Sequence, residues 1–370
     1  MAKSKLFLLS AFFFIFYINA SAQQNNFSVI AYYAGGPNQV DSFPIEKLTH
    51  IIFSFSHLKG NELHINNARD TATIEKLVSL KSRNPNLKVI LSLGGWGGCA
   101  TCSDVFSTKS GRKEFVKSVK NLSKYFHTDG IDLDWEYPAI EGFPSHKYQA
   151  ADKQNFTSLV NQLRKKLGNK YEISFAAGGF RQFIEESIEW EKVMKKVDRV
   201  NLMTYDLVNG FDTSTGHHTP LYSTPYQTES TAQAVKELVN AGVAKNKIVI
   251  GAAFYARIWE NVADSAFGLY QTGRYKKNVD FKNFDTQLSV DSGFIYHWDE
   301  VANAPYMYNP AKKLFVTYDN KNSIRLKTQY VVDQGLNGIM FWQLAYDTFD
   351  NGLLGVIDDV KTSYKSASGH

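Results

Sequence analysis

Short β-rich runs alternate with amphipathic helical segments along most of this 370-residue chain. Residues 71–83, 111–126 and 231–242 have the 3.6-residue apolar periodicity of a helix. The β-rich runs are residues 27–33, 50–55, 88–95, 130–136, 171–179, 198–206, 247–255 and 338–344. Because a strand followed by a helix leads to a neighbouring parallel strand, the pattern predicts an α/β fold, a closed (β/α)8 TIM barrel.

The gap between the last two β-rich runs is too long for a single helix. Residues 259–320 are rich in Tyr, Phe, Trp and Asn, and we interpret them as a small α+β subdomain inserted between the seventh strand and the seventh helix. Residues 322–335 then supply that helix. The predicted barrel therefore comprises residues 23–258 and 321–370.

The first 22 residues have the pattern of a secretory signal peptide. Lys3 and Lys5 precede an apolar run that ends at the small residues Ala20-Ser21-Ala22. An uncleaved anchor is the alternative, but the run is short for a membrane span. We expect a secreted or periplasmic protein with no membrane association after cleavage. The small net charge of +5 argues against nucleic acid as a partner.

The only two cysteines, Cys99 and Cys102, lie three residues apart. A local disulfide, a thioredoxin-like redox pair and half of a metal site are the alternatives. The secretory signal favours the disulfide, and no second cysteine pair exists to complete a zinc cluster. The pair His217-His218 has no acid–histidine spacing typical of zinc, so we interpret it as a solvated loop and predict neither metal nor cofactor.

Acidic and apolar side chains alternate in the stretch DGIDLDWEYP, residues 129–138. Residues two apart on a strand share a face, so one face of this strand is apolar and the other acidic. In a parallel barrel the apolar face contacts the helices and the acidic face points inward. The apolar face has Ile131, Leu133 and Trp135, and the inward face has Asp132, Asp134 and Glu136.

Three carboxylates in a poorly solvated interior repel one another, so at least one should have a raised pKa. A carboxyl that stays protonated near neutral pH can act as a general acid. Glu136 would lie nearest the C-terminal mouth, where barrel enzymes place their chemistry. A structural network of hydrogen-bonded acids and a divalent-metal site are the alternatives.

DGIDLDWE resembles the D-x-x-D-x-D-x-E motif of the family 18 glycoside hydrolases, the chitinases. Ala256 departs from the glycine that is usual between Tyr and Arg in that family, and residues 344–350 are a looser version of its acidic stretch. Further resembling motifs are SLGG (92–95), NLMTYD (201–206), FYAR (254–257) and GIMFWQL (338–344), in the order usual for the family.

The resemblance implies substrate-assisted, retaining catalysis. Glu136 would be the general acid and base, and Asp134 would orient the 2-acetamido group of the substrate. Asp132 would lie beneath Asp134 and share its proton. Tyr205 would hydrogen-bond the acetamido group, and Trp342 would form an apolar floor under the reacting sugar.

The resemblance also implies a set of residues that line the sugar-binding cleft. For Phe55 and Met203 ordinary barrel filling is the alternative, and for Asp206 and Arg257 it is an ion pair. Trp96 follows two glycines at a strand end, which favours a partly exposed platform for a sugar ring. The full set is Tyr32, Phe55, Trp96, Met203, Asp206, Tyr255, Arg257 and Trp342.

The sequence therefore predicts a secreted, monomeric chitinase that hydrolyses β-1,4-linked N-acetylglucosamine polymers, with chitin or chitooligosaccharide as its partner. One alternative is an endo-β-N-acetylglucosaminidase that acts on N-glycans, although those relatives generally lack the inserted subdomain. The other is a chitin-binding lectin without activity, which would typically lack the acid at the position of Glu136.

Overall fold

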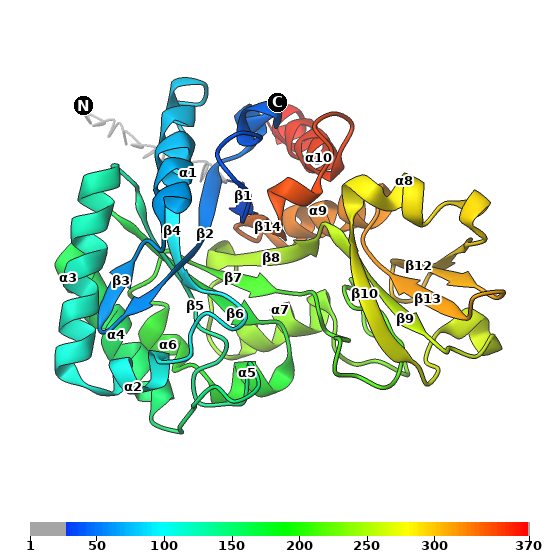
Figure 1. Ribbon diagram of the computed structural model, residues 1–370, viewed down its shortest axis with the longest axis horizontal. Helices are drawn as coiled ribbons and strands as arrows, with labels where there is room; N and C mark the ends of the chain where they lie inside the picture. Colours follow the sequence, from blue (N-terminus) through cyan, green and yellow to red (C-terminus); the bar gives the residue numbers. More distant parts are fainter. Residues whose placement is uncertain (1–26, 369–370) are drawn as a thin grey trace, which may run out of the picture.

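The computed structural model describes residues 27–368, so the predicted signal peptide lies outside the described residues. Eight parallel strands close into a barrel, since the first pairs with both the second and the last. The predicted (β/α)8 fold is confirmed (Figure 1). The barrel strands are β1 (Ser28–Tyr33), β2 (His50–Lys59), β4 (Lys88–Gly94), β5 (Gly130–Asp134), β6 (Glu172–Gly178), β7 (Arg199–Met203), β8 (Ile248–Ala253) and β14 (Gly338–Trp342).

Helices cover the outside of the barrel, and polar side chains define where several of them begin. Asn67, Thr108 and Ser230 each accept a backbone N–H in the first turn of a helix, and Asn320 forms a capping box. The helices are α1 (Ala68–Ser79), α2 (Cys102–Ser107), α3 (Lys109–Phe126), α4 (Asp152–Leu167), α5 (Arg181–Glu186), α6 (Trp190–Val193), α7 (Thr231–Asn240), α9 (Lys321–Gln334) and α10 (Leu353–Ser368).

The acidic strand β5 has the orientation that its alternation predicts. Ile131 and Leu133 are buried in the core between the strands and the helices. Trp135 packs there too, with its ring centroid 5.4 Å from that of Phe106 and 6.3 Å from that of Phe156. Since neighbouring residues of a strand point to opposite faces, the intervening acids face the barrel interior.

A second sheet lies beside the barrel, on the right of Figure 1. It is antiparallel, in the order β10-β9-β13-β12-β11, and Tyr306 and Tyr318 are buried in its two apolar clusters. The first strand of this sheet in chain order, β9, begins at Tyr255. The sequence places the start of the insertion slightly later, at residue 259. The elements are β9 (Tyr255–Glu260), β10 (Arg274–Asp280), α8 (Phe284–Gln287), β11 (Ile295–Asp299), β12 (Ala304–Asn309) and β13 (Leu314–Thr317).

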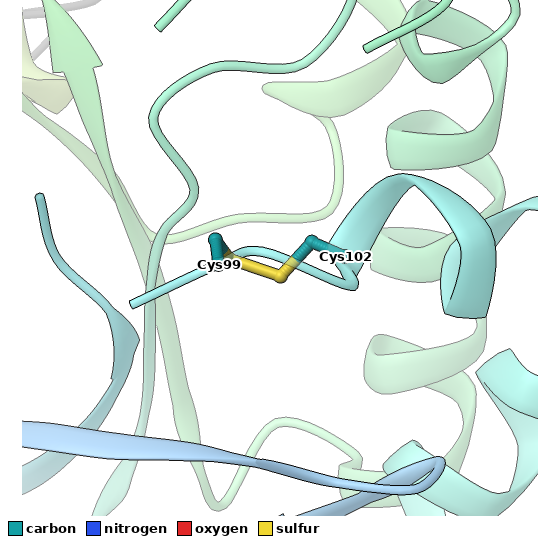
Figure 2. Close-up of a disulfide and its surroundings, with 2 residues drawn as sticks. All are labelled: Cys99 and Cys102. Atoms are coloured by element: carbon teal, nitrogen blue, oxygen red, sulfur yellow. A yellow bond between two sulfur atoms is a disulfide. The ribbon is translucent and has the colours of Figure 1, made fainter. Parts of the chain in front are cut away.

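A short strand, β3 (Glu62–His64), pairs antiparallel with the last residues of β2, from His57 to Lys59. Cys99, in the loop after β4, and Cys102, the first residue of α2, form a disulfide, as Figure 2 shows. The Cα atoms of the two cysteines are 5.1 Å apart and both residues are buried, so the bridge fixes the turn that enters α2. Among the described helices, none has the length and apolar character needed to cross a membrane.

Candidate active site

A cavity of about 1090 Å³ lies where the C-terminal ends of the barrel strands meet the second sheet. Barrel enzymes carry their functional residues at this end. All but two of the side chains that the sequence predicts for catalysis or substrate binding line the cavity. These are Phe55, Trp96, Asp134, Glu136, Met203, Tyr205, Asp206, Tyr255, Arg257 and Trp342. The other two, Asp132 and Tyr32, are buried in the barrel interior.

Asp132 accepts four hydrogen bonds from side chains of four other strands. Ser174 Oγ at 2.6 Å and Asn201 Nδ2 at 3.1 Å donate to its Oδ1. Tyr32 Oη at 3.0 Å and Ser92 Oγ at 2.9 Å donate to its Oδ2. Burial raises the pKa of Asp132, and these four donors act in the opposite direction by stabilising the carboxylate. The deepest acid of the ladder is therefore held rigidly.

Asp134 has far weaker support than the acid below it. Its Oδ1 is buried and has no hydrogen-bond partner among residues 27–368. Burial raises the pKa of Asp134 well above its ordinary value, and the charges of Glu136 and Asp132 raise it further. Because a buried oxygen without a hydrogen-bond partner is unfavourable, the Asp134 carboxyl gains free energy if it turns and Oδ1 hydrogen-bonds to a bound molecule.

Glu136 lies at the top of the ladder, on the cavity wall. Burial raises its pKa from an ordinary 4.5 to about 7. The neighbouring Tyr137 hydroxyl acts against this shift, whereas the negative charge of Asp206 adds to it. A carboxyl with this pKa still holds its proton near neutral pH and can donate it, as a general acid requires.

Tyr205 faces the same cavity with a phenol that is kept protonated. Burial raises the pKa of Tyr205 well above 10, and the charges of Asp134 and Asp206 add to the effect. Within the described chain, its hydroxyl has only a 3.9 Å contact with Met340 Sδ. The O–H therefore remains available to a bound molecule.

Trp342 forms an apolar surface at the end of β14. Its ring stacks on Phe55, with centroids 5.5 Å apart and an interplanar angle of 11°. The Tyr32 ring lies 6.1 Å away on the barrel side. Met203, the other predicted apolar contact, is 9% exposed and packs with these rings. Such a surface suits the apolar face of a sugar ring.

Asp206, Tyr255 and Arg257 form a polar cluster where the barrel meets the second sheet. Tyr255 Oη donates to Asp206 Oδ1 at 2.6 Å, and Arg257 Nε donates to the same oxygen at 2.5 Å. Burial alone would raise the pKa of Asp206, but hydrogen bonds from His218 and Arg257 and the Arg257 charge lower it overall. The ion pair weighed as an alternative is present, and both residues also line the cavity.

Trp96 lies at the edge of the cavity and is 49% exposed, as its position after two glycines predicts. Its ring centroid is 5.5 Å from that of Phe143 and 6.2 Å from that of Phe211. Phe211 also lines the cavity and was not predicted, because it lies in a loop with no periodic pattern. The three rings come from different loops and make one aromatic edge.

The interpretation of His217-His218 as a solvated loop is wrong. Both side chains are fully buried, because each finds a carboxylate partner that offsets the loss of solvation. His217 Nε2 lies 3.0 Å from Asp299 Oδ2, and His218 Nδ1 lies 3.4 Å from Asp206 Oδ1. In the described part of the chain, no group of three or more His, Cys, Asp or Glu is arranged to hold a metal ion.

Comparisons with known proteins agree with this geometry. Residues 14–347 match the family model of the glycosyl hydrolases family 18. Chitinase A1 of Niallia circulans is 33% identical over 330 residues, which are 80% of this chain and 47% of that protein. Chitinase B of Serratia marcescens is 25% identical, over 90% of this chain and 83% of that protein.

A solved structure of a family 18 enzyme is also similar to this chain. The glycoside hydrolase family 18 N-acetylglucosaminidase from Paenibacillus barengoltzii superimposes with a TM-score of 0.82 at 35% sequence identity. The match covers 90% of this chain and 100% of that one. This chain spans about half the length of Chitinase A1, whereas it spans the whole of the solved N-acetylglucosaminidase. With a family model that matches most of its length and relatives above 30% identity, the chain belongs to the glycosyl hydrolases family 18.

Proposed function

We propose that this protein is a chitinase that hydrolyses β-1,4-linked N-acetylglucosamine polymers by substrate-assisted, retaining catalysis. The observation that carries the proposal is the inward ladder of Asp132, Asp134 and Glu136, whose top member lines the cavity with a pKa of about 7. Family membership and relatives named as chitinases support it. The substrate is a chitin chain or a chitooligosaccharide.

In the first step Glu136 donates its proton to the glycosidic oxygen. The C1–O bond breaks while the carbonyl oxygen of the substrate's own 2-acetamido group bonds to C1, which gives an oxazolinium ion. In the second step the Glu136 carboxylate takes a proton from water, and the water oxygen bonds to C1 as the oxazolinium ring opens. Two displacements at C1 retain the anomeric configuration.

The neighbouring side chains have roles that follow from their contacts. Asp134, whose Oδ1 lacks a partner within residues 27–368, turns toward the acetamido N–H and stabilises the positive charge of the intermediate. Asp132, held in place by its four donors, takes up the proton that it shares with Asp134, so that Asp134 turns as a carboxylate. The Tyr205 hydroxyl donates to the acetamido group, and the stacked rings of Trp342 and Phe55 support the sugar from below.

A second candidate has the same chemistry but a different product. Since an N-acetylglucosaminidase is 35% identical and fully covered by this chain, removal of single sugars from a chain end is the specific alternative. The subdomain at residues 259–320 belongs to the proposed binding cleft in either case. We also propose export through the N-terminal signal peptide and a monomeric state.

The test is mass spectrometry of products from the N-acetylglucosamine hexamer, with the wild type beside Glu136→Gln. Dimers and trimers from the wild type support a chitinase, and predominant monomer supports the N-acetylglucosaminidase. A Glu136→Gln variant that binds the hexamer but releases nothing identifies the acid. An intact hexamer with both proteins contradicts the enzyme proposal.

A further inference from the structure

The buried pair His217-His218 lies between β7 and α7, where the barrel meets the second sheet. The backbone of His218 is fixed from both sides of this junction. Its N–H donates to Thr317 Oγ1 on β13 at 3.0 Å, and its carbonyl accepts the N–H of Leu207 at 3.0 Å. A backbone hydrogen bond therefore joins His218 directly to Leu207, the residue that follows Asp206.

The His218 side chain contacts two members of the polar cluster in the cavity wall. Its Nδ1 lies 3.4 Å from Asp206 Oδ1. Its ring centroid lies 5.2 Å from the ring of Tyr255, whose hydroxyl donates to that same oxygen. His218 itself does not line the cavity, so it stands behind the cluster.

The surroundings of the ring select its neutral form with the proton on Nδ1. Nε2 is buried and has no hydrogen-bond partner in the described chain, so an imidazolium would bury an unpaired N–H. Arg257 already supplies a cation to Asp206. Burial lowers the pKa of His218, and the Arg257 charge adds to this, while Asp206 and Asp319 oppose it. His218 is thus a neutral donor to a charged acceptor.

Three donors therefore converge on one oxygen of Asp206, from His218, Tyr255 and Arg257. Within the described residues these side-chain hydrogen bonds of Asp206 all end on Oδ1, and Asp206 lines the cavity, so Oδ2 can accept a hydrogen bond from a ligand there. The backbone of Asp206 has φ 57°, in the left-handed region that a non-glycine residue adopts only where its surroundings hold it. The contacts of His218 and its neighbours supply that support.

We infer that His218 is a positioning residue for Asp206 and Tyr255, and that it holds these two side chains in the orientation needed to bind the sugar. The inference rests on the proposed function, because Asp206 acts here on a bound saccharide. His218 touches no substrate itself. It acts through one hydrogen bond and one ring contact, both on the side of the cluster that faces away from the cavity.

Two variants of His218 separate its hydrogen bond to Asp206 from its ring contact with Tyr255, and a variant of His217 is the control. His218→Phe keeps a ring against Tyr255 but removes the donor, and His218→Asn keeps an N–H donor close to the position of Nδ1. His217→Gln is the matched control, because His217 is equally buried but pairs with Asp299 rather than with Asp206. For each variant we would measure kcat and KM on N-acetylglucosamine oligomers, together with Tm.

We expect His218→Phe to raise KM between about threefold and tenfold, with a smaller change in kcat. The effect is smaller than for a typical hydrogen bond to a carboxylate because the bond from His218 to Asp206 is long, at 3.4 Å, and acts on the sugar only through Asp206. His218→Asn should restore most of the loss, and His217→Gln should match the wild type. A His218→Phe protein with wild-type KM overturns the inference. Equal losses in His218→Phe and His217→Gln overturn it too, since they indicate a general packing role.

The calorimetric affinity of each variant for the hexamer, measured on the Glu136→Gln background, gives a readout independent of turnover. A wild type that neither binds nor cleaves the oligomers would contradict the proposed function. A wild type that cleaves them, beside a His218→Phe protein of equal affinity and KM, would contradict only the positioning role. The two failures are therefore distinguishable.

Discussion

The hydroxyl of Tyr32 donates a 3.0 Å hydrogen bond to Oδ2 of Asp132, and so joins the first barrel strand to the fourth across the barrel interior. Asn201 Nδ2 donates both to Tyr32 Oη and to Asp132 Oδ1 at 3.1 Å. The tyrosine is therefore part of the support of the carboxylate ladder. The Tyr32 hydroxyl therefore lies beside Asp132 in the barrel interior. The sequence predicted instead that Tyr32 lines the cleft.

Tyr32→Phe should lower kcat about tenfold or more with little change in KM, because a hydrogen bond to a charged group contributes roughly 1.5–3 kcal/mol. The phenylalanine ring can still pack against Trp342, so the apolar floor is retained. Steady-state kinetics on an N-acetylglucosamine oligomer measures the effect. Unchanged kcat, or a change confined to KM, would show that the hydroxyl does not support the ladder.

The rate of hydrolysis should fall as pH rises through about 7, the pKa of Glu136. Only the protonated carboxyl can donate to the leaving oxygen, so well above this pKa each pH unit costs about tenfold in kcat/KM. A profile of kcat/KM from pH 5 to pH 9, with Tm followed in parallel, tests this. An alkaline limb far below pH 6 would contradict Glu136 as a buried acid.

Glu136→Gln should stabilise the protein more at pH 8 than at pH 5. The pKa of Glu136 is raised on folding, so between its ordinary 4.5 and about 7 the folded chain holds a proton that the unfolded chain releases. Stability therefore falls as pH rises through this window, by roughly 3 kcal/mol from this group.

The amide cannot ionise and escapes this cost. Urea unfolding of wild type and variant at both pH values gives the difference. The prediction fails if the stability gap between the two proteins is the same at pH 5 and pH 8.

Trp96→Ala should lower kcat/KM for the hexamer about threefold to tenfold, since an exposed ring that stacks on a sugar contributes roughly 0.5–1.5 kcal/mol. Tm should hardly change, because half of the side chain is already in solvent. Tyr125→Ala is the matched control, an aromatic on α3 that is 70% exposed and does not line the cavity. If both variants have equal kcat/KM, Trp96 does not contribute to substrate binding.

The periodicity of the sequence was sufficient to predict the barrel and the inward acids. All eight β-rich runs are barrel strands, because apolar alternation and strand length are local properties. Ser174 and Asn201, two of the donors to Asp132, were missed. The same alternation could have found them, since their neighbours Phe175, Val200 and Leu202 face the helices.

Other features depend on contacts that no local pattern contains. His217 pairs with Asp299, a residue 82 positions away in the second sheet, so its burial could not be read from its own neighbours in sequence. The sequence places the start of the inserted subdomain at residue 259 from its composition, which does not mark where one sheet ends and the next begins. Only the pairing of Tyr255 with Asp280 shows that the chain has already left the barrel.

The second sheet leaves and rejoins the barrel through neighbouring strands, because β9, which enters it, pairs with β13, which returns, through Arg257 and Thr317. A segment whose two ends lie side by side can be exchanged without moving the scaffold that receives it. The second sheet is therefore a segment that can be replaced, in evolution or by design, while the barrel keeps its structure. A transplanted module bounded at Tyr255 and Thr317 would carry part of the cavity wall with it, and the carboxylate ladder would stay on the host barrel.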